Sequence, residues 1–146
     1  MKKIPSVSTG ATKQGEHNDC VVRAITNVSG KPYDEVHALL KRFGRKDRKA
    51  TYWAVSEAAM QELGYESVYF GNNRAALFYG KYKSKPYEQK SVTLKTLIND
   101  LPKGKFVVYI KGHALAMIDG KIIDMFDNKE SSRVIAIFYD PQSVFA

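Results

Sequence analysis

Apolar residues recur at helical spacing in three segments of the first half of the chain, and a glycine follows each segment. The first has apolar residues at positions 21, 24, 25 and 28, and either Asn18 or Asp19 can cap it. The second follows Pro32, which suits a first helical turn, and the third extends from residue 52 to residue 63. Gly30, Gly44 and Gly64 are suitable helix stops. The pattern therefore predicts helices over about 19–28, 33–43 and 52–63.

The second half of the chain changes to an alternating pattern, which is typical of strands. The strand-like runs are Glu66–Phe70, Phe106–Ile110, His113–Ile118, Lys121–Phe126 and Arg133–Tyr139. Asp119-Gly120 predicts a hairpin turn, and Thr93 can cap a short helix that ends near Asp100. Residues 71–90 are polar, basic and rich in tyrosine, so we expect a loop there. Helices followed by an antiparallel sheet predict one α+β domain over residues 1–146.

Composition narrows the class of protein. The chain has 146 residues, of which 44% are hydrophobic and 26% charged, as in an ordinary globular domain. No apolar run approaches the ~18 residues that span a bilayer, and the first residues lack the apolar core of a secretion signal. A single cysteine cannot form an internal disulfide, and one cysteine with three histidines at these spacings matches no zinc pattern. We expect a cytoplasmic protein without a membrane segment, metal or cofactor.

Positive charge is concentrated in two segments. The net charge is +8, and much of the excess lies in residues 41–49 and in Lys81, Lys83 and Lys85, which alternate with tyrosines. Basic residues between aromatic ones can bind a phosphate backbone and stack on bases. A solvated basic surface is the favoured interpretation, and the same charge would also serve an acidic protein partner.

Cys20 lies in the first turn of a predicted helix, where unpaired N–H groups and the helix dipole favour a thiolate. A cysteine nucleophile also needs a base and donors for the oxyanion. His113 begins a strand, so it lies at the rim of the sheet, where it can meet a helix start. The side chain of Gln14 and the backbone N–H of Cys20 would be the oxyanion donors. His17 is too close to Cys20 along the chain, and we expect His37 on the surface of the second helix.

A carboxylate should orient the imidazole, and two aspartates, Asp124 and Asp127, follow the histidine strand. If Asp119-Gly120 is a two-residue turn, residue 118 pairs with 121 and residue 115 with 124. Asp124 then shares the face of His113 as its diagonal neighbour. A three-residue loop with a glycine bulge shifts the register by one and favours Asp127. We favour Asp124.

These segments resemble those of papain-like cysteine peptidases. Gln14-x-Glu16-x-x-Asp19-Cys20 is similar to the catalytic segment of bacteriocin-leader peptidase domains of ABC exporters, which read Gln-x-acid-x-x-Asp-Cys. The strand that begins Gly112-His113 resembles the papain-like histidine strand, which continues through a hairpin to the orienting Asn or Asp. The chain also resembles small phage-encoded proteins of papain-like type over nearly its full length. It departs from the exporter peptidases at Val21, where they usually have glycine, and it lacks the tryptophan that follows papain's cysteine.

The resemblance implies a papain-like fold, with the cysteine at a helix start and an antiparallel sheet at the C-terminal end. It also implies a thiol-dependent hydrolase, a cysteine peptidase or isopeptidase, that cleaves an amide of a peptide or protein through a thioester. Cys20 would be the nucleophile, His113 the general base and acid, Asp124 the orienting group and Gln14 an oxyanion donor. The alternative is a catalytically inactive papain-like effector that binds host protein or nucleic acid through its basic surface.

Overall fold

Helices come first and most strands later, as the pattern predicts. The computed structural model describes residues 18–70, 73–83, 91–124 and 128–145. Within these ranges the first elements are α2 (Cys20–Ser29), α3 (Tyr33–Arg42), α4 (Trp53–Glu62), β1 (Glu66–Tyr69), α5 (Asn73–Lys83) and α6 (Leu94–Asp100). They are followed by β2 (Lys105–Ile110), β3 (His113–Ile118), β4 (Lys121–Ile123), β5 (Val134–Tyr139) and α7 (Pro141–Val144). The predicted α+β class is confirmed.

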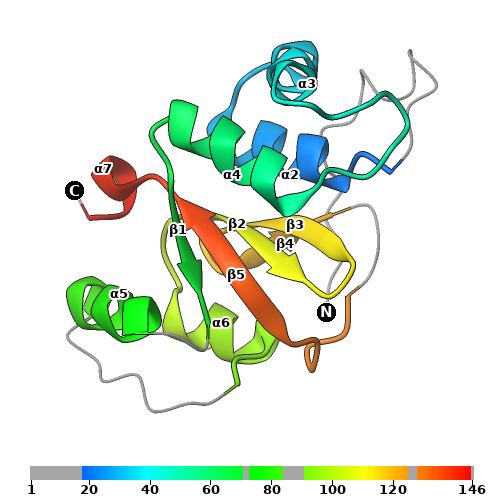
Figure 1. Ribbon diagram of the computed structural model, residues 1–146. Helices are drawn as coiled ribbons and strands as arrows, with labels where there is room; N and C mark the ends of the chain where they lie inside the picture. Colours follow the sequence, from blue (N-terminus) through cyan, green and yellow to red (C-terminus); the bar gives the residue numbers. More distant parts are fainter. Residues whose placement is uncertain (1–17, 71–72, 84–90, 125–127, 146) are drawn as a thin grey trace.

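The strands form one antiparallel sheet in the order β1-β5-β2-β3-β4. In Figure 1, helices α2, α3 and α4 cover one face of this sheet, and α5 and α6 cover the other. Successive residues of a strand point to opposite faces, so Phe106 and Val108 join one hydrophobic cluster while Val107 joins the other. The sheet is therefore buried on both faces.

Helix α2 packs on strand β3, and this contact carries the candidate site. Ala114 and Ala116 are buried on the face of β3 that meets the buried side chains Val22 and Ile25 of α2. Because both strand residues have only a methyl group, the helix can approach the strand closely. The first residues of α2 and β3 are thereby brought to the same end of the sheet.

The turn between β3 and β4 has two residues, as predicted. Ile118 pairs with Lys121, Met117 with Ile122, and Ala116 with Ile123. Asp119 and Gly120 have φ angles of 49° and 76°, the left-handed values that a type I′ turn requires at both central positions. The same register, continued by one step, places residue 124 opposite residue 115.

The expectation of a loop over residues 71–90 is wrong for residues 73–83, which form α5. Ala75, Phe78 and Tyr79 are buried, and Tyr82 packs partly against the same cluster. These positions lie three and four residues apart, so they form one helical face beneath the lysines. Residues 84–90, with Lys85, lie outside the described residues.

Two further expectations are wrong in the basic part of the chain. His37 is buried rather than on the surface, with its ring stacked 6.0 Å from that of Tyr33 and its Nε2 3.5 Å from Asp47 Oδ1. Arg45 is buried as well, although we expected the 41–49 segment to be solvated.

The strand predicted from residue 121 to residue 126 is shorter than expected, because β4 ends at Ile123.

Candidate functional site

The cysteine and the histidine predicted to form the site are in contact. Cys20 is the first residue of α2, His113 is the first residue of β3, and their side chains form a hydrogen bond. Cys20 is partly exposed and lines a pocket. Both residues line the same pocket, so the fold brings them together.

Asp124 lies beside the imidazole of His113. Its Oδ2 lies 2.5 Å from His113 Nε2, and the side chains of Asp124 and His113 are 6% and 19% exposed. Because Asp124 engages Nε2, Nδ1 is the ring nitrogen left for the thiol. A short charge-assisted bond of this kind fixes both the tautomer and the plane of the ring. Asp127, the alternative to Asp124, lies outside the described residues.

Asn128 extends this set of contacts, and sequence reasoning missed it. Its Nδ2 donates a hydrogen bond of 2.9 Å to Asp124 Oδ2, the oxygen that faces the imidazole. Asp124 follows a strand and lies just outside regular structure, so this bond helps to hold its carboxylate in place. No local pattern around residue 128 indicates the role, because it depends on how the chain returns after β4.

The surroundings of Cys20 and His113 favour their charged forms. Burial opposes ionisation of Cys20, but hydrogen bonds from His113 and the backbone N–H of Ala114, with the charges of His113 and Arg23, lower its pKa below the ordinary value. The hydrogen bond to Asp124, followed by that to Cys20, raises the pKa of His113 to about 9 despite burial. Both shifts favour a thiolate beside an imidazolium over the neutral pair.

Asp19, next to Cys20, is buried and takes part in a polar cluster. Tyr33 donates a hydrogen bond of 2.6 Å to Asp19 Oδ2. Arg23 Nη1 lies 2.9 Å from Asp19 Oδ1, close enough for an ion pair although the angle makes no hydrogen bond. Asp19 occupies the N-cap position of α2, but its side chain makes no capping bond, contrary to the simplest expectation. The cluster instead ties the start of α2 to α3.

A pocket of about 370 Å³ opens beside the Cys20–His113 pair. We call it the Cys20 pocket; its wall includes Val21, Trp53, Tyr69, Tyr109, Ile110 and Ile135, together with Ala50 and Thr51 from the loop before α4. The ring of Trp53 lies 4.7 Å from that of Tyr69 and 5.0 Å from that of Tyr109. Thr51 Oγ1 is buried without a hydrogen-bond partner among the described residues. The wall is therefore largely aromatic and aliphatic, and it suits an apolar substrate group.

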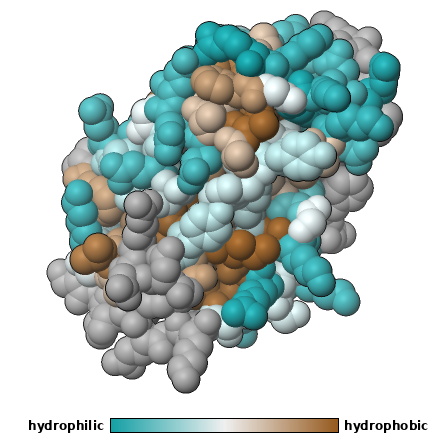
Figure 2. Space-filling model, viewed as in Figure 1, coloured by the Kyte–Doolittle hydropathy of each residue, from teal (hydrophilic) through white to brown (hydrophobic). Residues whose placement is uncertain are grey.

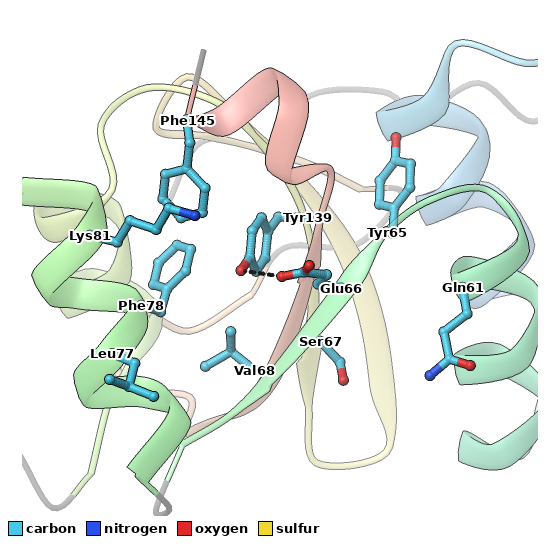
Figure 3. Close-up of a pocket in the computed structure, with 10 residues that line it drawn as sticks. All are labelled: Gln61, Tyr65, Glu66, Ser67, Val68, Leu77, Phe78, Lys81, Tyr139 and Phe145. Carbon is cyan, nitrogen blue, oxygen red and sulfur yellow. Dashed lines mark hydrogen bonds between the residues drawn. The ribbon is translucent and has the colours of Figure 1, made fainter.

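A second pocket, of about 480 Å³, lies between β1, α5 and the C-terminal end of the chain. Figure 3 shows its lining residues, among them Lys81 above the ring of Phe145 and Tyr139 bonded to Glu66. Its lining includes no cysteine or histidine among the described residues. We therefore place the candidate active site in the smaller Cys20 pocket.

Two further observations bear on the sequence predictions. Gln14, the predicted oxyanion donor, and His17 lie outside the described residues. Among the residues that the structure does describe, none of the helices has the length and apolar character needed to cross a bilayer.

Comparisons with protein-family models, with curated proteins and with solved structures find no match to this chain. The case for a function therefore rests on the geometry of the site.

Proposed function

We propose that this protein is a thiol-dependent hydrolase of papain-like type, a cysteine peptidase or isopeptidase. The observation that carries the proposal is the connected set Cys20–His113–Asp124, in which the carboxylate bonds Nε2 of the ring and the thiol bonds the same imidazole. Cys20 also lies at the start of a helix that packs on an antiparallel sheet, and this position supports a papain-like arrangement.

The chemistry follows from the charge states of the pair. The Cys20 thiolate attacks the carbonyl carbon of an amide, and the new C–S bond places negative charge on the oxygen. When the tetrahedral intermediate collapses, the C–N bond breaks and the leaving nitrogen takes the proton from His113. The thioester that remains is hydrolysed when neutral His113 accepts a proton from water and the oxygen of that water attacks the acyl carbon. Breakage of the C–S bond releases the acid and restores the ion pair.

The oxyanion requires donors near the nucleophile. The first N–H groups of a helix lack acceptors within the helix, and Cys20 is the first residue of α2. We propose the backbone N–H of Cys20 as one donor and the side chain of Gln14 as the other.

The pH dependence of alkylation by iodoacetamide tests the activated thiol. In wild type, the Cys20 rate should rise with an apparent pKa below the free-cysteine value of ~8.5 and already be high at neutral pH. His113→Ala should raise the apparent pKa, because only the backbone N–H of Ala114 and the charge of Arg23 then oppose the effect of burial. His37→Ala is the control, since it removes a buried histidine that lies in α3 and does not line the Cys20 pocket. If wild type and His113→Ala react alike at every pH, the proposal is wrong.

Acyl transfer needs a separate test, because a reactive thiol need not turn over. Wild type should release a burst of nitrophenolate from 4-nitrophenyl acetate and carry the acetyl group on Cys20 in intact-mass and peptide analysis. Cys20→Ala should show no burst. An acetyl group that forms on Cys20 but is lost no faster than from a free thioester would contradict hydrolysis.

A binding protein that does not use its thiol is the second candidate, favoured by the exposed basic residues after α3. Cys20→Ala would then leave its biological effect intact. Reversal of charge should be made at Lys46 and Lys49, because Arg45 is buried and Arg42 pairs with Glu62. Loss of the effect in Cys20→Ala would exclude this candidate.

A further inference from the structure

The loop between α3 and α4 brings positive charge to the edge of the Cys20 pocket. Lys46, Arg48 and Lys49 are exposed in this loop, and the two residues that follow line the pocket. Asn18 Nδ2, two residues before the nucleophile, donates a hydrogen bond of 3.2 Å to the carbonyl oxygen of Arg48. In Figure 1 this loop passes the start of α2, and Figure 2 shows hydrophilic side chains over α3 and the loop.

Asp47, the acidic residue of this loop, forms its ion pairs with residues of α3 rather than with the exposed lysines of the loop. Asp47 is directed to α3, where its Oδ2 lies 3.3 Å from Lys41 Nζ and its Oδ1 lies 3.5 Å from His37 Nε2. Within the described part of the chain, neither Lys46 nor Lys49 has an ion-pair partner. With a net charge of +8 over the whole chain, the region beside the pocket should attract anions at long range.

The loop has a defined backbone. The N–H of Arg45 bonds the carbonyl of Leu40 at 2.9 Å, and the N–H of Lys49 bonds that of Lys46 at 3.1 Å. Arg45 is buried, which anchors the start of the loop, and Arg48 has a left-handed φ of 64°. The three exposed basic side chains are therefore held on a short turn rather than on a free tail.

We propose that the Cys20 site takes acidic peptide segments, in which glutamates or aspartates near the scissile amide meet Lys46, Arg48 and Lys49. This inference rests on the proposed function and names the substrate class for it. Opposite charges at the rim of an interface raise the association rate and select the partner. A peptide fits the site better than a nucleic acid, because it supplies both an acyl carbon for the thiolate and a side chain for the apolar pocket.

Protection of Cys20 from iodoacetamide by synthetic peptides tests this directly. Three peptides of equal length would carry the same central apolar residue, flanked by glutamates, glutamines or lysines. At low salt the glutamate peptide should halve the alkylation rate at a concentration about 10-fold lower than the glutamine peptide, and the lysine peptide should protect least. Raising the salt concentration should reduce this advantage, because the charges involved are exposed.

Two charge-reversal variants localise the effect. Lys46→Glu with Lys49→Glu should abolish the preference for the glutamate peptide. Lys105→Glu with Lys121→Glu changes the net charge equally at exposed positions by the turn end of the β3–β4 hairpin, away from His113, and should retain the preference. The salt dependence in wild type needs no variant, so the test survives if the first pair does not fold.

The outcomes separate the two proposals. An ordinary alkylation profile without any peptide would remove the hydrolase and this inference with it. An activated Cys20 that the glutamate and glutamine peptides protect equally would overturn the inference alone. Equal loss of preference in both charge-reversal pairs would do the same, as would protection by an RNA or DNA oligonucleotide at lower concentration than by the glutamate peptide.

Discussion

Replacement of Asp124 by asparagine separates the charge of this residue from its shape. The Asp124 side chain is 6% exposed and lies 2.5 Å from His113 Nε2. Asparagine has nearly the same size, and its amide oxygen can still accept the hydrogen bond from the ring. The variant should therefore keep the imidazole oriented while it removes the negative charge that stabilises the imidazolium.

The size of the effect follows from the pKa of His113. The bond to Asp124 is the largest of the causes that raise this pKa from 6.5 to about 9. At pH 7.5 a group of pKa 9 is ~97% protonated and one of pKa 6.5 is ~9% protonated, a difference of about 10-fold. The hydrogen bond from His113 to Cys20 remains in Asp124→Asn, so the pKa of His113 in this variant should lie between these two values. Hydrolysis needs both the thiolate and the imidazolium, so the alkaline limb of its pH profile should move from near 9 to lower pH.

NMR titration of the histidine ring protons gives the pKa value of each histidine. The signal that disappears in His113→Ala is that of His113, which assigns its pKa. Glu130→Gln is the matched control, because it removes one negative charge from an exposed position in the same part of the chain. It should leave the pKa of His113 unchanged. A pKa that stays near 9 in Asp124→Asn, or that is already near 6.5 in wild type, would refute the electrostatic account.

Three further predictions follow from single contacts. Asn128→Ala removes the 2.9 Å hydrogen bond to Asp124. Because a hydrogen bond to a charged group contributes ~1.5–3 kcal/mol, the rate of hydrolysis should fall about 10-fold or more. A variant with wild-type kinetics would contradict a positioning role for Asn128. Tyr33→Phe leaves the buried carboxylate of Asp19 without its 2.6 Å donor, so urea unfolding should show that the free energy of unfolding falls by ~1–3 kcal/mol. An unchanged free energy of unfolding would mean that water replaces the hydroxyl. Ala116→Leu should overpack the contact between β3 and α2, lowering stability by ~1–3 kcal/mol and slowing alkylation of Cys20, whereas unchanged alkylation would argue against the close helix–strand contact.

The errors of the sequence analysis have a common physical cause. In α5 the apolar positions 75, 78, 79 and 82 follow a helical spacing, but the lysines and tyrosines around them suggested a loop. His37 and Arg45 are polar residues that are nevertheless buried: His37 lies near Asp47, and the backbone N–H of Arg45 bonds the carbonyl of Leu40. Polarity alone predicts exposure, and it fails where the fold supplies a compensating charge or hydrogen bond.

Local chemistry determined several features that could be predicted without the structure. Helix stops at glycine, the cap at Thr93 and the Asp119-Gly120 turn depend on backbone sterics and on neighbours a few residues away. That turn sets the register of the hairpin, and the register places Asp124 beside His113. Cys20 at a helix start was predictable for the same reason.

Only the tertiary structure decided which residues meet across long stretches of chain. The approach of α2 to β3 requires two hydrophobic clusters to form on opposite faces of one sheet, and it joins the thiol to the imidazole. The bond from Asn128, the burial of Asp19 and the position of the basic loop beside the Cys20 pocket depend on the same packing. Such contacts are selected by the total burial that the whole chain achieves, and no short segment contains that information.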